Sequence, residues 1–133
     1  MEPEQIFRSA TAAVVRGDFD AAAAFLHEDV VFDMSRSRGP LQGVYTGPDE
    51  IRHYWQEMYE AWKPVAWDVE PVGHPDPETV VLESMPRARG RGSGIELQGR
   101  GGLIVRVRDE KLVSITLFQS PEEASQTVAG QTD

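Results

Sequence analysis

The spacing of the apolar residues changes once along this chain, near Pro64, and that change constrains the fold more than any other feature. Before it, apolar residues recur at helical intervals in three segments. From Val65 onward they alternate with polar residues, which is the period of a strand with one buried face. Helices followed by a strand meander predict an α+β fold, with the helices packed on one face of an antiparallel sheet.

Three helices are expected before the change of period. The first runs from Glu2 to Arg16, and the second, "FDAAAAFLH", runs from Phe19 to His27 behind an Asp18 cap. The third, "GPDEIRHYWQEMYEAWKP", has Pro48 in its first turn and stops at Pro64. Its apolar positions form one stripe at helical spacing: Ile51, Tyr54, Trp55, Met58 and Trp62.

The remaining segments are predicted to be strands. "VVFDMS" lies between the second and third helices, and "VAWDV" follows the third helix and precedes a loop, "GHPDPE". Longer strands are expected at Thr79 to Gly90, Ile95 to Arg108 and Leu112 to Gln119. A final helical turn is expected after Ser120, and residues 129–133 are expected to be a frayed tail.

The first long hairpin is predicted to have one apolar and one polar face. A turn at 93–94 sets Arg91 opposite Glu96 and Arg89 opposite Gln98, as cross-strand pairs on the polar face. Aromatic residues that would stack on nucleic-acid bases are missing between the arginines, which favours an outer sheet face over a nucleic-acid site. We call this set the charged outer face: Arg87, Arg89, Arg91, Glu96 and Arg106.

The second long hairpin can turn through two or three residues. A three-residue turn at 109–111 pairs Val107 with Val113 and Leu103 with Leu117. A two-residue turn would instead set apolar residues opposite hydroxyl-bearing ones. Apolar matching therefore favours the three-residue turn.

Composition limits the classes of function. The 133 residues are expected to form a single domain, with its core at about residues 4–120. The net charge of −9 argues against a nucleic-acid partner. The chain has no cysteine, no run approaching the roughly 20 apolar residues of a membrane span and no secretory signal pattern at its start. We therefore expect a cytoplasmic protein without a membrane partner.

Metal and cofactor sites are not predicted. His27, His53 and His74 fall on three separate elements, and none forms a metal-binding pair on one helix. No nucleophile elbow, phosphate-binding loop or dinucleotide fingerprint occurs in the sequence.

Asp33 is the one candidate catalytic residue. Strand alternation in "VVFDMS" points Phe32 and Met34 inward and Asp33 outward, unless a bulge shifts the phase. If Asp33 pointed inward, burial would raise its pKa and make it a plausible general base. If it points outward, it is expected to pair with Arg36 or Arg38 in the adjoining loop.

The segments "RGDFDAAAAFLHEDVVFDMS", "GVYTGPDEIRHYW" and "RGRGSGIELQGRGGLIVRVRDEKLVSITLF", in that order, resemble the SnoaL-like branch of the nuclear transport factor 2-like superfamily. The resemblance implies a cone in which three N-terminal helices are wrapped by a strongly curved, mixed or antiparallel sheet. It also implies a pocket at the open end and a homodimer that pairs through the outer sheet face. The family often has glycine where this chain has Glu110.

The resemblance includes ketosteroid isomerases, which use a tyrosine, an aspartate base and a protonated aspartate. Those positions correspond here to Ala10, Met34 and Leu103, so isomerase chemistry of that kind is not supported. Gln119 occupies the region where polyketide cyclases of the superfamily carry a carboxylate, and an amide cannot act as a base.

The sequence thus predicts a domain that binds a hydrophobic small molecule in an apolar pocket. Proton-transfer chemistry on a hydrophobic carbonyl compound, namely isomerisation, cyclisation or dehydration, is one possibility, and a non-catalytic binding or dimerisation module is the alternative. Small residues on the inner sheet face leave volume for the pocket: Ala88, Gly90, Gly99 and Gly101. The expected ligand contacts are Phe32, Met34, Tyr54, Met58, Trp62, Ser84, Leu103, Leu117 and Gln119.

The charged outer face yields a first prediction. Replacing Arg89 by Glu reverses a charge on the surface expected to pair, so it should change dimerisation or solubility while ligand binding stays intact. Analytical ultracentrifugation and a binding assay on the same variant test this. Loss of ligand binding with an unchanged oligomeric state would contradict the assignment.

Overall fold

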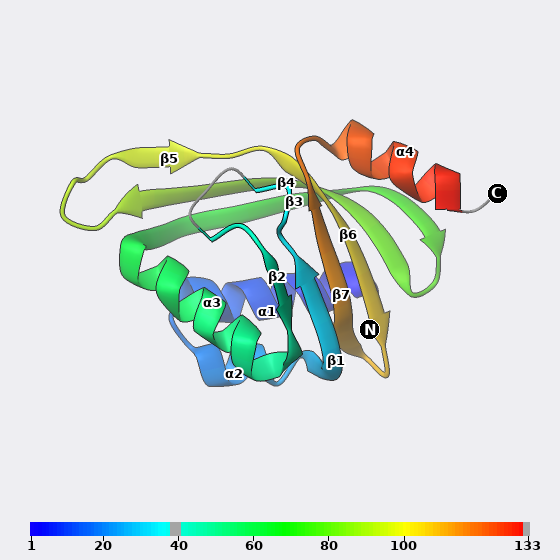
Figure 1. The fold of residues 1–133 in the computed structure, drawn as a ribbon, viewed down its shortest axis with the longest axis horizontal. Helices are drawn as coiled ribbons and strands as arrows, with labels where there is room; N and C mark the ends of the chain where they lie inside the picture. The colour runs from blue at the N-terminus through cyan, green and yellow to red at the C-terminus, as the bar shows by residue number, and fades with distance from the viewer. Residues whose placement is uncertain (38–40, 132–133) are drawn as a thin grey trace.

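The computed structural model describes residues 1–37 and 41–131 and contains four helices and seven strands within those ranges (Figure 1). Their bounds are α1 Pro3–Val15, α2 Phe19–Ala23, β1 Leu26–Asp33, β2 Val44–Thr46, α3 Gly47–Ala61, β3 Trp62–Asp76, β4 Thr79–Gly90, β5 Glu96–Gln98, β6 Gly101–Arg108, β7 Lys111–Phe118 and α4 Pro121–Gln131.

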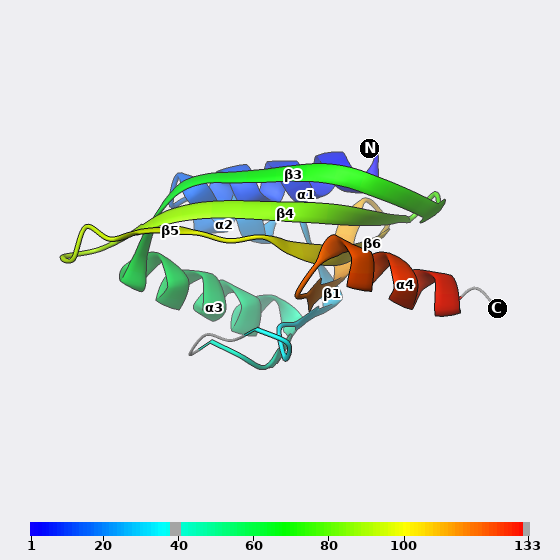
Figure 2. The ribbon, with the colours of Figure 1, turned by 90° about the horizontal axis from the view of Figure 1, so that it is seen from above.

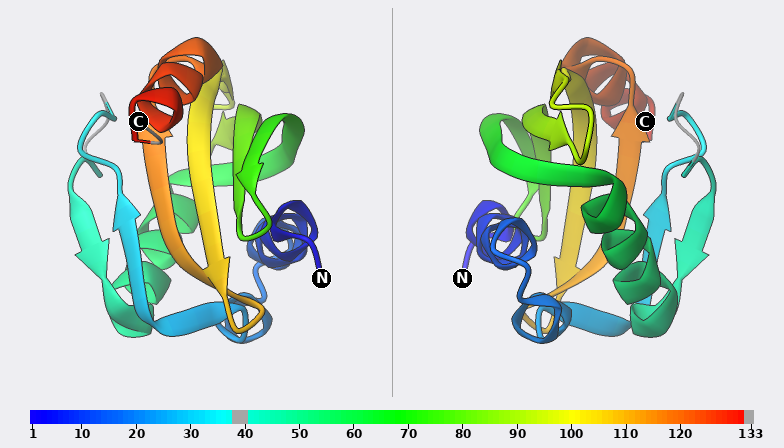
Figure 3. Two further views of the ribbon diagram at one scale, coloured as in Figure 1. Left: turned by 90° about the vertical axis from the view of Figure 1, so that its right-hand side faces the viewer. Right: turned by 90° about the vertical axis from the view of Figure 1, so that its left-hand side faces the viewer.

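The strands form one mixed sheet in the order β2-β1-β7-β6-β4-β3, and β5 pairs with β4 beyond the end of β6. Only the β1–β7 pair is parallel among the strand pairs of the described residues. The sheet curves around α1, α2 and α3, and α1 lies along the edge strand β3 (Figures 2 and 3). The predicted α+β class and curved sheet over three N-terminal helices are therefore confirmed.

The core lies between these three helices and the inner face of the sheet. The apolar face predicted for α1 is buried, with Phe7 and Ala10 almost fully inaccessible. Ile51 and Trp55 are the buried residues of the apolar stripe of α3. The inner sheet face adds Leu82 and Leu103, among others, to the same core. Burial of one face of each element, rather than helix propensity, holds the layers together.

The third helix ends earlier than predicted. It stops at Ala61, and Trp62 begins β3 opposite Gly90. Pro64 disfavours a helical conformation at Lys63, the residue before it, and the chain is already extended at Trp62, two residues ahead of the expected stop. Trp62 therefore projects from a strand instead of the helix stripe.

The second helix and the third strand also differ from expectation. The helix ends at Ala23, and His27 lies in β1, because pairing of Leu26 with Leu112 draws the segment into the sheet. The predicted loop after "VAWDV" is instead the second half of β3, which continues to Asp76 on the sheet edge. Prolines are tolerated in β3 because one side of this edge strand pairs with no other strand and therefore needs no N–H donors.

The first long hairpin is shifted by two residues from its predicted register. Arg89 lies opposite Glu96 and Arg87 opposite Gln98, so the predicted Arg91–Glu96 and Arg89–Gln98 pairs are wrong. Gly90 N donates to Ile95 O at 2.8 Å, and residues 91–94 form the turn. A shift of two residues preserves which side chains face inward, so the predicted faces survive.

The three-residue turn predicted for the second long hairpin is wrong, because Arg108 pairs with Lys111 and leaves only two residues in the turn. Asp109 and Glu110 form a two-residue turn, and Val107 pairs with Leu112 instead of the predicted Val113. A bulge between Arg106 and Val107 then restores the predicted pairing of Leu103 with Leu117, and Val105 pairs with Ile115.

A fourth helix extends well beyond the single turn expected after Ser120. Ala124 and Val128 of α4 pack on the outer-facing side chains of Val81, Ile104 and Phe118. Gly102 permits this approach, since a Cβ atom there would collide with the Ser120 carbonyl. Of the predicted frayed tail, residues 129–131 belong to this helix, and 132–133 lie outside the described residues.

The tight turn between β6 and β7 generates a stability prediction. Both turn residues have positive φ, 54° at Asp109 and 60° at Glu110, a conformation that glycine adopts without the cost that a side chain brings. Glu110→Gly should raise the free energy of unfolding by about 0.5–1 kcal/mol, measured by urea denaturation. Glu110→Ala, which removes the same charge but keeps a Cβ atom, should show no such gain; equal gains would reject the strain argument.

Candidate functional site

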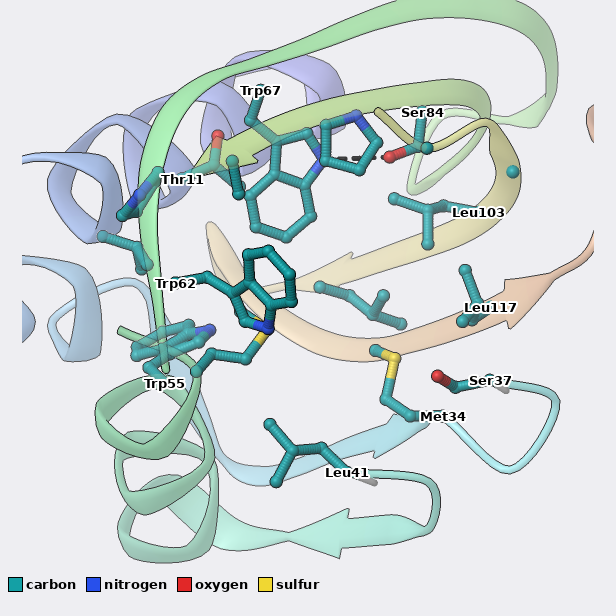
Figure 4. Close-up of a pocket in the computed structure, with 18 of the residues that line it drawn as sticks. Thr11, Met34, Ser37, Leu41, Trp55, Trp62, Trp67, Ser84, Leu103 and Leu117 are labelled. Carbon is teal, nitrogen blue, oxygen red and sulfur yellow. Dashed lines mark hydrogen bonds between the residues drawn. The ribbon is translucent and has the colours of Figure 1, made fainter. Parts of the chain in front are cut away.

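A cavity of about 810 Å³ lies between the helices α1 and α3 and the concave face of the sheet (Figure 4). Side chains from α1, β1, α3 and β3 line it, together with those of β4, β6 and β7. A second depression, of about 350 Å³, is formed by exposed residues around Glu2 and His74 and has no buried wall. The larger cavity is therefore the candidate site.

The structure brings together all nine residues expected to contact a ligand. Phe32 and Met34 point inward from β1 and are only 3% and 7% exposed, as strand alternation predicted. The full set lines the cavity: Phe32, Met34, Tyr54, Met58, Trp62, Ser84, Leu103, Leu117 and Gln119. That they contact a ligand remains a prediction.

Small residues of the sheet produce the volume. Ala88, Gly99 and Gly101 lie on the cavity wall, where larger side chains would fill the space. A Cβ atom on Gly101 would lie 3.0 Å from the Phe118 carbonyl oxygen and 3.5 Å from Leu117 Cδ1. A side chain at residue 101 would therefore be crowded by β7.

Aromatic side chains form much of the remaining wall. The rings of Phe32 and Trp55 meet edge to face with centroids 5.9 Å apart. The Tyr54 ring lies 4.8 Å from that of Tyr45, and burial raises the pKa of Tyr54 to about 12. The Tyr54 phenol is thus protonated at neutral pH and can act as a hydrogen-bond donor.

Besides the Tyr54 phenol, two aliphatic hydroxyl groups are buried on the cavity walls. Ser84 on β4 is 4% exposed, and its Oγ accepts a hydrogen bond from Trp67 Nε1 at 2.9 Å. Thr11 on α1 uses its hydroxyl hydrogen within its own helix, donating to the Arg8 carbonyl oxygen at 3.2 Å. Trp67 was not among the expected contacts, because its place on the inner face depends on the long pairing of β3 with β4.

Gln119 lies at the mouth of the cavity rather than on its inner wall. The side chain is exposed, and its Nε2 donates to the Arg36 carbonyl oxygen. The Arg36 guanidinium stacks over the Phe118 ring, 4.5 Å from its centroid. Gln119 and Arg36 therefore connect the loop after β1 to the end of β7.

Asp33 is not part of the cavity wall. Its Oδ1 accepts hydrogen bonds from the Ser35 hydroxyl at 2.6 Å and the Ser35 amide at 3.1 Å, and these bonds lower the pKa of Asp33. Arg36 Nη1 lies 3.8 Å from Asp33 Oδ2, which matches the pairing expected of an outward residue. The alternative partner Arg38 lies outside the described residues. An ionised, outward carboxylate cannot serve as a base inside the cavity.

Charged side chains that contribute to the lining sit at its rim. Glu57 bonds to His53 Nε2 at 3.0 Å, and Arg100 pairs with Glu83 at 2.8 Å and Glu122 at 3.2 Å. Arg87 is exposed. In the part of the chain that the structure describes, the lining contains no buried carboxylate or imidazole, and no three His, Asp or Glu residues are arranged to hold a metal ion.

The charged outer face is only partly assembled as expected. Arg89 Nη2 lies 4.0 Å from Glu96 Oε2, a cross-strand pair. Arg91 instead stacks over the Tyr59 ring, 4.6 Å from its centroid, and donates to the Tyr59 carbonyl oxygen at 2.6 Å. Arg91 is thus held against α3 and is not available on the sheet surface.

A SnoaL-like domain model matches residues 7–115, which is most of the chain. The chain belongs to the SnoaL-like family. The match spans both halves of the cavity wall, from the middle of α1 to β7. No significant match was found among curated proteins.

Solved structures share the fold of this SnoaL-like domain at low sequence identity. A nuclear transport factor 2-like protein from Burkholderia xenovorans has a TM-score of 0.73 at 20% identity, covering 95% of both chains. A Mycobacterium tuberculosis protein in complex with estradiol-17beta-hemisuccinate has a TM-score of 0.75 at 14% identity, covering 88% of this chain and 93% of that one. The Δ5-3-ketosteroid isomerase from Mycobacterium sp. has a TM-score of 0.77 at 13% identity, with coverages of 92% and 96%.

The three positions that the resemblance aligned with isomerase catalytic groups all line the cavity of this SnoaL-like domain. They are Ala10, Met34 and Leu103, and each is buried and apolar. The side chains at these three positions therefore cannot transfer a proton. No helix of the described residues is long and apolar enough to cross a membrane.

The inward position of Met34 can be tested by titration. Met34→Asp places a carboxylate on a buried apolar wall, so its pKa should rise well above the ordinary value of about 4. NMR titration of the new carboxyl carbon measures the pKa. The matched variant Val72→Asp adds the same group at an exposed position of β3 and should titrate normally. A normal pKa at residue 34 would contradict the inward assignment.

Proposed function

We propose that this SnoaL-like domain binds a neutral, apolar small molecule in its cavity. The observation that carries the proposal is an 810 Å³ cavity with apolar buried walls, whose charged lining residues are confined to its rim. Ligand pockets for drug-sized molecules have volumes of about 300–1,000 Å³ and mostly apolar linings.

The energetics favour a neutral ligand over a charged one. Burying about 250 Å² of apolar ligand surface contributes roughly 6 kcal/mol before the cost of immobilisation. A charged group carried to the inner wall would lose its hydration without meeting an opposite charge among the described residues. The similar fold in complex with estradiol-17beta-hemisuccinate supports a ligand whose apolar part is comparable in size to a steroid.

Proton transfer is the less favoured function. Isomerisation, cyclisation or dehydration of a hydrophobic carbonyl compound requires a base within reach of the substrate. Asp33 lies outside the cavity with a lowered pKa, and Tyr54, with a pKa of about 12, stays protonated. The described walls therefore suit binding without chemistry.

We also propose that the chain self-associates through the part of the outer sheet face that α4 does not cover. Arg87, Arg89 and Glu96 remain exposed there, whereas α4 covers Val81, Ile104 and Phe118. A homodimer of this chain would accordingly pair through the β4–β5 end of the sheet.

Filling the cavity tests the binding function. Leu117→Trp adds bulk inside the cavity and should weaken binding of the neutral fluorescent hydrocarbon pyrene by roughly tenfold or more, a loss of about 1.4 kcal/mol. Titration of pyrene fluorescence measures the affinity, and native mass spectrometry of freshly purified protein identifies any retained natural ligand.

The matched control is Val72→Trp, which adds an indole at an exposed position of β3. Its pyrene affinity should equal that of the unmodified protein. Equal pyrene binding by Leu117→Trp, or no pyrene binding by the unmodified protein, would reject the proposed function.

A further inference from the structure

The hydrogen bond between Trp67 and Ser84 has a fixed direction. An indole N–H can only donate, so Ser84 Oγ is the acceptor in the 2.9 Å contact. The Ser84 hydroxyl hydrogen must then point away from Trp67. Among residues 1–37 and 41–131, Ser84 donates no hydrogen bond to a protein acceptor. The buried pair therefore has one unused donor.

The neighbouring strand presents no side chain opposite this donor. Ser84 pairs with Gly101 of β6, which has no side chain to cover the hydroxyl. Both residues line the cavity, and Figure 4 shows Ser84 beside the Trp67 indole with Leu103 nearby. The hydroxyl of Ser84 is thus a polar point on an otherwise apolar part of the wall.

Trp67 is itself held in place by packing. Its ring meets Phe7 of α1 edge to face, with centroids 5.8 Å apart and an interplanar angle of 87°. The indole therefore fixes the Ser84 oxygen from one side before any ligand enters. A donor that is already oriented loses less entropy when a ligand binds.

On the basis of the proposed binding function, we propose that the Ser84–Trp67 pair is a donor site, which donates a hydrogen bond to a carbonyl oxygen of the ligand. The ligand class is then a neutral, apolar carbonyl compound whose oxygen meets the Ser84 hydroxyl in front of Gly101. This position differs from Ala10 and Leu103, where the family resemblance would place the groups that bind a substrate oxygen in the isomerases. The Thr11 hydroxyl is not equivalent, since its hydrogen is bonded to the Arg8 carbonyl.

Two rigid probes of nearly equal shape test the donor site: fluorenone, which carries a carbonyl, and fluorene, which does not. We define the carbonyl preference as the ratio of the fluorene Kd to the fluorenone Kd. Ser84→Ala should lower this ratio roughly three- to tenfold, the effect of one neutral hydrogen bond. The infrared carbonyl stretch of bound fluorenone should lie at lower frequency in the unmodified protein than in the variant.

Two further variants make the result specific. Ser84→Ala leaves the Trp67 N–H free to donate in its place, so the combination of Ser84→Ala with Trp67→Phe should lose the infrared shift completely. Thr11→Val removes a hydroxyl whose hydrogen is already bonded, so the carbonyl preference should be unchanged.

The outcomes separate this inference from the proposed function. If both probes bind but the combination of Ser84→Ala with Trp67→Phe leaves the ratio and the carbonyl stretch unchanged, the donor site is rejected while binding in the cavity stands. If neither probe binds the unmodified protein, the binding function fails and the donor site fails with it. A lowered ratio with an upward shift of the carbonyl stretch supports both.

Discussion

The pairing of β4 on both of its edges is the constraint on which the rest of the structure depends. Along one edge it bonds to β3, and along the other to β6 and then β5. This double pairing fixes the direction of each β4 side chain. Leu82 and Ser84 face the helices, and Val81 faces α4. The core, the cavity and the covered outer surface are therefore set by one strand.

Side-chain size along the inner face then decides where the domain is solid and where it is hollow. Near Val80 and Leu82, opposite Val105 and Leu103, large side chains fill the space against the helices. Farther along the same face, between residues 84 and 101, the cavity is lined by the small residues Ser84, Ala88, Gly99 and Gly101. The helices do not pack directly against these residues. The cavity is thus a consequence of small residues at one end of a close-packed layer.

The polar groups of the site follow the same logic. A charged side chain on the inner wall would lose its hydration. The charged side chains that line the cavity lie at its rim, where Glu57 pairs with His53 and Arg100 pairs with Glu83. Asp33 satisfies its carboxylate with Ser35 and Arg36 outside the cavity. What remains inside is neutral, so under the proposed binding function the cavity would disfavour charged ligands and discriminate among neutral ones by shape and by hydrogen-bond direction.

The sequence by itself determined which residues face inward, because strand alternation has a period of two and survives the two-residue error in the β4–β5 register. It also indicated Met34, and not Asp33, as the wall residue. Only the tertiary structure decided the lengths of β3 and α4, since these depend on pairing with β4 and on packing over Val81. For the same reason, the contact between Trp67 and Ser84 could not be read from a sequence that separates them by 17 positions.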